Sequence, residues 1–151
     1  MPAEQLDFSF VQDQIVRKIL EDYWSQTGKA FEAGSYLGTL VGCGSIVEGL
    51  LTWALLQHEA EALKSVKAKD ESGQVMPLRK WYLPRLIEVS YDLKLIGQKA
   101  KLASWAVKDF RNFIHPYILL EWSGRPDLGL AESALGALRE ITRSLRGRLP
   151  K

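Results

Sequence analysis

The chain has 151 residues, enough for one domain that buries a core without help from disulfides or metal ions. A single cysteine, Cys43, excludes an internal disulfide, and the first residues lack the basic and apolar stretches of a signal peptide, so we expect a cytoplasmic protein. The net charge is only +2, but residues 1–63 carry three basic and nine acidic side chains, and residues 64–151 carry 17 basic and nine acidic ones. The basic C-terminal half indicates an anionic partner.

A first helix is predicted over residues 8–31, where apolar side chains recur at helical spacing. Val11, Ile15, Ile19 and Tyr23 follow one another every four residues. We therefore expect these four side chains to form the buried face of this helix.

A second helix is predicted over residues 35–64, and its apolar side chains on all sides indicate that it is buried. Within it, the segment 34–56 is long enough to cross a membrane and has glycines at a four-residue spacing that membrane helix pairs also use. Glu48 would lie well inside such a span, which is costly. We therefore predict the central helix of a soluble bundle and no membrane association.

The charged segment 67–77 contains Gly and Pro and predicts a loop. A third helix is expected from about Pro84, a residue suited to a first turn, to about residue 115. Apolar residues recur every seven positions along one face of this helix: Leu86, Leu93, Ala100, Val107 and Ile114. Between them, on the same face, a second set also recurs every seven positions: Ser90, Gly97, Ser104 and Arg111. Arg111 is therefore predicted to point inward, where an unpaired charge is costly, and Glu48 is its expected partner.

A fourth helix is predicted over residues 127–146. Its core face consists of Ala134, Leu138, Ile141 and Leu145, and a basic stripe of Arg139, Arg143 and Arg146 lies beside it. Long amphipathic helices joined by short loops predict an all-α fold, an antiparallel bundle of four main helices. We expect one domain spanning residues 1–151.

The candidate site is the segment Asp109-Phe110-Arg111-Asn112-Phe113-Ile114-His115-Pro116. Arg111 and His115 are four residues apart, so a helix would place them on the same face. Pro116 disfavours helical geometry at His115, which is therefore expected at a helix C-terminus, where the macrodipole favours a cationic imidazole. An arginine beside a titratable histidine can bind a phosphate and transfer a proton. In the alternative interpretation, His115 only caps the helix and Arg111 only pairs with Glu48.

Other catalytic chemistries find no support in the sequence. The Gly-rich run 42–49 has neither the lysine of a phosphate-binding loop nor the spacing of a dinucleotide site. With two histidines and one cysteine, a zinc site is not expected, and no closely spaced carboxylates suggest a metal-dependent nuclease. We therefore predict that no cofactor and no metal is required.

Several aromatic residues surround the candidate segment, and their role has two interpretations. They are Trp105, Phe110, Phe113, Tyr117 and Trp122. Such residues belong to the core, or they form a platform on which nucleic-acid bases stack. An exposed ring beside His115 would favour stacking.

The predicted bundle resembles the HEPN (higher eukaryotes and prokaryotes nucleotide-binding) domain superfamily. The resemblance depends on the apolar second helix with Glu48, the motif Arg111-Asn112-x-x-His115-Pro116 at the end of the third helix, and a last helix rich in Leu, Ala and Arg. It extends over essentially the whole chain, and its specific part is the motif.

This resemblance implies a metal-independent endoribonuclease of a toxin–antitoxin, phage-defence or CRISPR system. It further implies a homodimer that brings two motifs into one cleft, with Arg111 in the arginine role, His115 in the histidine role and Asn112 as the polar residue between them. RNA, a cognate antitoxin or a nucleotidyltransferase are the implied partners. The three residues between Arg111 and His115 are fewer than in most nuclease members. Other members have no catalytic activity and act as helical modules for interaction or regulation, which is the alternative function.

Elementary chemistry is compatible with the nuclease hypothesis. Cleavage of RNA by its own 2′-OH needs a proton acceptor, a proton donor and stabilisation of charge on the phosphate. Two copies of His115 and a bidentate Arg111 supply these three functions. The small residues Gly97, Ala100 and Ser104 predict the close helix contact of a dimer.

Overall fold

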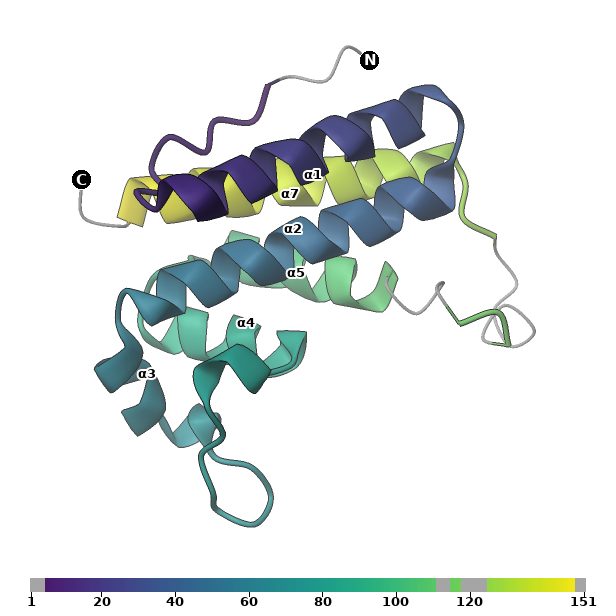
Figure 1. The fold of residues 1–151 in the computed structure, drawn as a ribbon. Helices are drawn as coiled ribbons and strands as arrows, with labels where there is room; N and C mark the ends of the chain where they lie inside the picture. Colours follow the sequence, from purple (N-terminus) through teal and green to yellow (C-terminus); the bar gives the residue numbers. More distant parts are fainter. Residues whose placement is uncertain (1–4, 111–114, 118–124, 149–151) are drawn as a thin grey trace.

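The computed structural model describes residues 5–110, 115–117 and 125–148. This part of the chain contains six α-helices, two short 3₁₀ helices and no β-strand (Figure 1). The helices are α1 (Gln14–Glu32), α2 (Tyr36–Leu56), α3 (Glu59–Lys64), α4 (Leu83–Asp92), α5 (Gln98–Phe110) and α7 (Leu128–Arg148), and the 3₁₀ helices are η1 (Val66–Ala68) and η2 (Leu78–Lys80). The predicted all-helical class is confirmed for these residues.

Helices α1 and α2 form an antiparallel hairpin, which is visible along the upper part of Figure 1. The carboxylate of Asp13 caps α1 by accepting hydrogen bonds from the backbone N–H groups of Ile15 (2.9 Å) and Val16 (3.1 Å). At the other end of α1, Gly34 adopts a φ of +76°, and the Ser35 N–H donates to the Ala30 carbonyl at 2.8 Å. This geometry is the Schellman motif, which stops the helix and turns the chain into α2.

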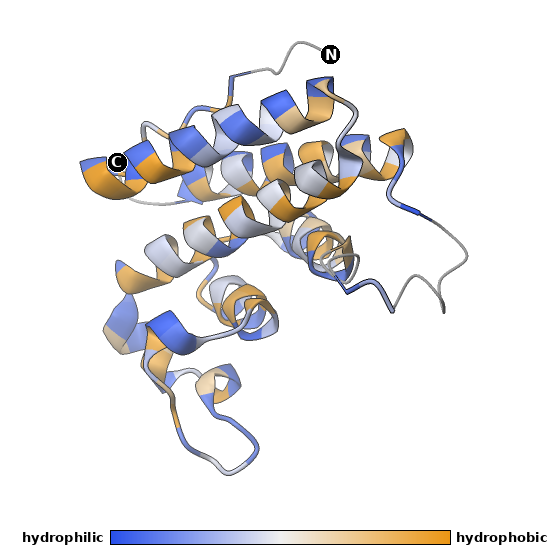
Figure 2. Ribbon diagram, turned by 45° about the vertical axis from the view of Figure 1, so that its right-hand side comes forward, coloured by the Kyte–Doolittle hydropathy of each residue, from blue (hydrophilic) through white to orange (hydrophobic). Residues whose placement is uncertain are grey.

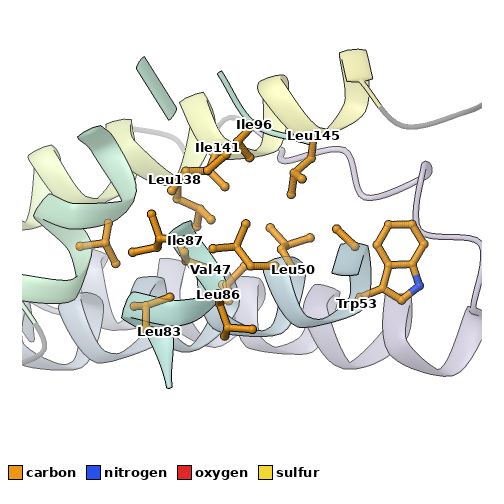
Figure 3. Close-up of a cluster of buried hydrophobic side chains, with 14 of the residues drawn as sticks. Val47, Leu50, Trp53, Leu83, Leu86, Ile87, Ile96, Leu138, Ile141 and Leu145 are labelled. Atoms are coloured by element: carbon orange, nitrogen blue, oxygen red, sulfur yellow. The ribbon is translucent and has the colours of Figure 1, made fainter. Parts of the chain in front are cut away.

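The core is built around α2, which packs against α1, α4, α5 and α7. Figure 2 shows that α2 is largely apolar, whereas α1 and α7 alternate between hydrophilic and hydrophobic residues. In the close-up of Figure 3, Val47 and Leu50 of α2 lie among side chains of α4 and α7, such as Leu86 and Ile141. Complete burial of these side chains is the main stabilising contribution in a fold of this kind.

The predicted buried face of the first helix is wrong. Ile15, Ile19 and Tyr23 have exposed fractions of 75%, 50% and 47%. The side chains that α1 buries are Leu20, Trp24 and Thr27, which form a neighbouring stripe at the same helical spacing. Val11 is buried as expected, but it precedes the helix, which begins only at Gln14.

The predicted third helix begins where expected and then divides into two. Helix α4 starts at Leu83, with Pro84 in its first turn, and ends at Asp92. Lys94 has a φ of 61°, and the Leu95 N–H donates to the Ser90 carbonyl at 2.9 Å, so a second Schellman motif ends α4. The chain then turns and continues as α5.

The predicted second helix over residues 35–64 also divides: α2 ends at Leu56 and α3 begins at Glu59, because His58 leaves helical geometry with φ −129° and ψ 37°. The predicted loop and fourth helix agree well with the structure. No α-helix lies between Lys64 and Leu83, where a loop was expected at 67–77; short 3₁₀ turns and the bridge between Lys69 and Val75 shape this segment. Helix α7 coincides closely with the predicted fourth helix. Its expected core residues Ala134, Leu138, Ile141 and Leu145 are all fully buried.

By length and composition, α2 is the one helix in the described part of the chain that could cross a membrane. However, 11 of its 21 residues are buried against other helices of the same chain. Helix α2 is thus the central helix of the core, as predicted.

Candidate functional site

The candidate segment is only partly within the described residues. Arg111 and Asn112 lie outside them, so the predicted shared helix face of Arg111 and His115 and the predicted contact between Arg111 and Glu48 remain predictions. His115 is described: it is exposed and lies in a bend that follows the described part of α5. Its imidazole is therefore accessible to a substrate from solvent.

Aromatic side chains near His115 divide into two groups. Trp105 and Phe110 of α5 are half-buried and pack against the core, so the core interpretation is confirmed for them. Tyr117, two residues after His115, is 83% exposed and offers an open ring. Phe113 and Trp122 lie outside the described residues. The exposed ring of Tyr117 is the feature that favours base stacking.

Basic side chains of α5 and α7 are partly neutralised by acids. Glu140 lies 3.5 Å from Arg143 and 3.9 Å from Lys99, and Lys101 lies 3.5 Å from Glu88. Glu88, Lys101 and Glu140 are only partly exposed, at 20–26% of their side chains, whereas Lys99 and Arg143 are 82% and 70% exposed. The surface of α5 and α7 therefore carries charges of both signs rather than a purely basic patch.

The small residues of the third predicted helix are used inside the chain. Ala100 and Ser104 are buried, and α5 packs along α7. The Gly97 N–H donates to Ser144 Oγ at 3.0 Å, and a Cβ at Gly97 would lie 2.7 Å from the Arg148 guanidinium. This face is covered by α7 and is not a surface on which a second copy can dock.

Exposed apolar side chains lie elsewhere, on α1 and α2, and the sequence analysis missed them. They are Ile15, Ile19 and Tyr23 of α1 and Leu37 and Val41 of α2, and we refer to them together as the α1–α2 face. Two hollows open on this side of the molecule, and both are lined by Tyr23 and Ser45. Ile15 and Ile19 were assigned to the core because their spacing is that of a buried stripe.

Glu48 is half-buried and lines the larger of these hollows, which has a volume of about 480 Å³. Residues of α1, α2 and η2 form its walls. Glu48 was predicted to point inward. It lies at a partly open cavity between α1 and α2 and not in the fully buried core.

Cys43 has a structural role. Cys43 is fully buried, and burial raises the pKa of its thiol to about 12, so it is a core residue as predicted and not a nucleophile. Within residues 5–110, 115–117 and 125–148, no three His, Cys, Asp or Glu side chains gather in a way that could hold a metal ion.

Known proteins add no further constraint on the site. No protein-family model, no curated protein and no solved structure matches this chain. The HEPN resemblance therefore depends on the motif and on the helical fold, and it is carried forward as a hypothesis.

Proposed function

We propose that this protein is a HEPN-type, metal-independent endoribonuclease in which Arg111 and His115 carry out catalysis. The observation that supports this proposal most directly is the exposed His115 in the bend after α5, four residues after Arg111 in the sequence. In this proposal, α1, α2, α5 and α7 are the four main helices of the antiparallel bundle.

The proposed reaction is a transesterification in which the downstream RNA fragment leaves with a free 5′-OH. One His115 accepts the proton of the 2′-OH while the 2′ oxygen forms a bond to phosphorus. The bond from phosphorus to the 5′ oxygen breaks, and a second His115 donates a proton to that leaving oxygen. Arg111 binds the phosphate bidentately and stabilises its developing charge. The products are a 2′,3′-cyclic phosphate and a 5′-OH.

Two acid–base groups require two copies of His115, so the proposal includes a homodimer with both motifs in one cleft. Asn112 and Glu48 have supporting roles, Asn112 as a polar group beside the phosphate and Glu48 as a carboxylate for Arg111. We further propose a cytoplasmic toxin or phage-defence component that is regulated by a cognate antitoxin or nucleotidyltransferase.

RNA cleavage by the purified protein in excess chelator tests this function. We expect cyclic phosphate products, and we expect His115→Ala and Arg111→Ala each to abolish cleavage while circular dichroism stays unchanged. Arg143→Ala, an exposed arginine on α7, serves as the matched control and should retain cleavage. Absence of cleavage of any RNA pool, or cleavage that survives both substitutions at the motif, would contradict the proposal.

A second candidate function is that of a non-catalytic module for protein interaction or regulation. The exposed apolar residues of the α1–α2 face favour it, because large apolar patches on a protein surface mark interaction sites. In that case a stable hetero-complex forms in cells, survives Arg111→Ala and His115→Ala, and is lost on Ile19→Glu. Leu102→Glu, at a 61% exposed leucine of α5, is the control that should leave the complex intact.

A further inference from the structure

The loop between η1 and η2 projects from the helical body, below α3 in Figure 1. Its shape is fixed by its own hydrogen bonds. The Asp70 carboxylate accepts from the backbone N–H groups of Ser72 at 3.0 Å and Gln74 at 2.9 Å, and a bridge between Lys69 and Val75 closes the loop behind them. A projecting segment that is already ordered can present its side chains to a partner at little cost in entropy.

Trp81 anchors the end of this loop to the core. It is 3% exposed, and its indole N–H donates to the Met76 carbonyl at 2.9 Å. The backbone of Trp81 is extended, with φ −71° and ψ 139°, so Lys80 and Tyr82 point to the side opposite the buried indole. Both are exposed, and Tyr82 makes no capping hydrogen bond to α4. The ring of Tyr82 is therefore open to a partner.

Positive charge is concentrated around the same loop. Residues 64–85 include six basic and two acidic side chains, a net charge of +4, whereas the whole chain has a net charge of only +2. The exposed cations are Lys64, Lys67, Lys69, Arg79 and Lys80. Within the described residues none of these five forms an ion pair, in contrast to Lys101 of α5 and Arg143 of α7. They can therefore pair with an external anion.

The arrangement of these groups favours a single-stranded nucleic acid over a membrane surface. Binding of single strands combines cations that follow the phosphates with an aromatic ring on which a base stacks. A membrane would first meet the tip of the loop, residues 70–74, which reads Asp-Glu-Ser-Gly-Gln. This tip has no apolar side chain to insert, and anionic lipids repel its two carboxylates.

We infer that residues 64–85 form a binding surface for single-stranded RNA. Tyr82 stacks on a base, and the exposed cations of the segment pair with the neighbouring phosphates. The choice of RNA rests on the proposed function. The surface includes neither Arg111 nor His115, so it holds the RNA and takes no part in the bond-breaking step.

A fluorescein-labelled 2′-O-methyl oligouridine of about 12 nucleotides measures binding separately from cleavage, because its blocked 2′ oxygen cannot attack phosphorus. We expect fluorescence anisotropy to show binding that weakens with salt, with a slope of about −3 in a plot of log K against log salt, since each of about four phosphate contacts contributes roughly −0.7. No binding, or a slope near zero, would overturn the inference and leave the cleavage reaction unaffected. Binding without cleavage of any RNA would contradict the proposed function alone.

Substitutions then assign the surface. Tyr82→Ala should weaken binding at least about fivefold, the lower end of the effect of one stacked base, and Tyr82→Phe should leave it unchanged. The double variant Arg79→Gln/Lys80→Gln should reduce the magnitude of the salt slope by about 1.4. Lys18→Gln/Lys29→Gln removes the same charge from exposed positions of α1 and, as the matched control, should leave the slope unchanged. Equal effects of the two double variants would mean that binding follows net charge alone and would overturn the inference.

Vesicles that contain phosphatidylserine test the competing partner, an anionic membrane. Val66 of η1 is 76% exposed and is the side chain best placed to enter lipid. We expect no co-sedimentation of the protein with these vesicles, and we expect Val66→Ser to bind the oligouridine as the wild type does. Vesicle binding that Val66→Ser abolishes, without binding of the oligouridine, would overturn the inference in favour of a membrane.

Discussion

Alanine at Gly42 and alanine at Gly136 should change the stability of the protein in opposite directions. Both glycines lie inside helices, where alanine is normally favoured over glycine by about 0.5–1 kcal/mol. Nothing lies within 4 Å of a Cβ at Gly136, so Gly136→Ala should stabilise by about that amount. A Cβ at Gly42 would overlap Thr27 Oγ1 and lie 3.0 Å from Thr27 Cβ.

Thr27 cannot easily move away from this overlap. It is 3% exposed, and its hydroxyl donates to the Tyr23 carbonyl at 2.7 Å. Overpacking of this kind costs about 1–3 kcal/mol. Because the overlap with Thr27 is severe, the upper part of this range, about 2–3 kcal/mol, applies. After subtraction of the helix preference, Gly42→Ala should destabilise by about 1–2.5 kcal/mol, or roughly 2–10 °C in melting temperature at this chain length.

Urea denaturation of both variants, followed by circular dichroism, measures the two free energies of unfolding. Thr27→Ala removes the overlapping atoms, so the double variant with Gly42→Ala should lose less stability than the sum of the single losses. If Gly42→Ala stabilised the protein as Gly136→Ala does, α1 and α2 would not be in the close contact described above, and the reasoning would fail.

Three further substitutions test local features of the fold. Lys94→Gly should stabilise the protein by about 0.5–1 kcal/mol in urea denaturation, since the left-handed conformation at φ 61° costs an L residue roughly 1–2 kcal/mol; a lower midpoint would contradict it. Asp13→Ala should cost about 0.5–2 kcal/mol in the same assay and Asp13→Asn much less, because only alanine removes the cap of α1; equal losses would argue against capping. Because the pKa of Cys43 is raised to about 12, stability should fall as the pH rises from about 9 towards 12, where the unfolded thiol loses its proton and the folded one keeps it. Cys43→Ala should show a smaller decline over that pH range, and an equal decline would contradict the argument.

The sequence predicted the helical class and most helix positions because these depend on local signals. Pro84 lies in the first turn of α4, and the core residues of α7 follow simple periodicity. The predicted start of the first helix at residue 8, however, lies before the capping residue Asp13, which directly precedes α1. The break after α4 has no such signal, since a lysine occupies the left-handed position that glycine usually takes. The heptad pattern continues across the break because Leu86 of α4 and Ala100 of α5 both pack into the same core.

The buried face of α1 could not be predicted from spacing because two stripes compete along that helix. Both stripes repeat every three or four residues, and the buried one contains Leu20 and the large indole of Trp24. Gly42 has no side chain, so Thr27 can pack against α2 beside Leu20 and Trp24. This contact between helices is not encoded by any local sequence pattern. The hollow at Glu48 was missed for the same reason, since it depends on how α1, α2 and η2 meet.

Because α2 lies at the centre of the core, its contacts with the other helices form at different stages of folding. Its contacts with α1 join neighbours in the chain, and a hairpin of this kind forms early because little loop entropy is lost. Its contacts with α7 join segments that are far apart in the sequence. Until α7 docks, the α2 side chains that meet Leu138, Ile141 and Leu145 have no cover. During synthesis the nascent chain therefore exposes an apolar groove on α2 until α7 has been made. Exposed apolar surface promotes aggregation, so a chaperone would be most useful at this stage.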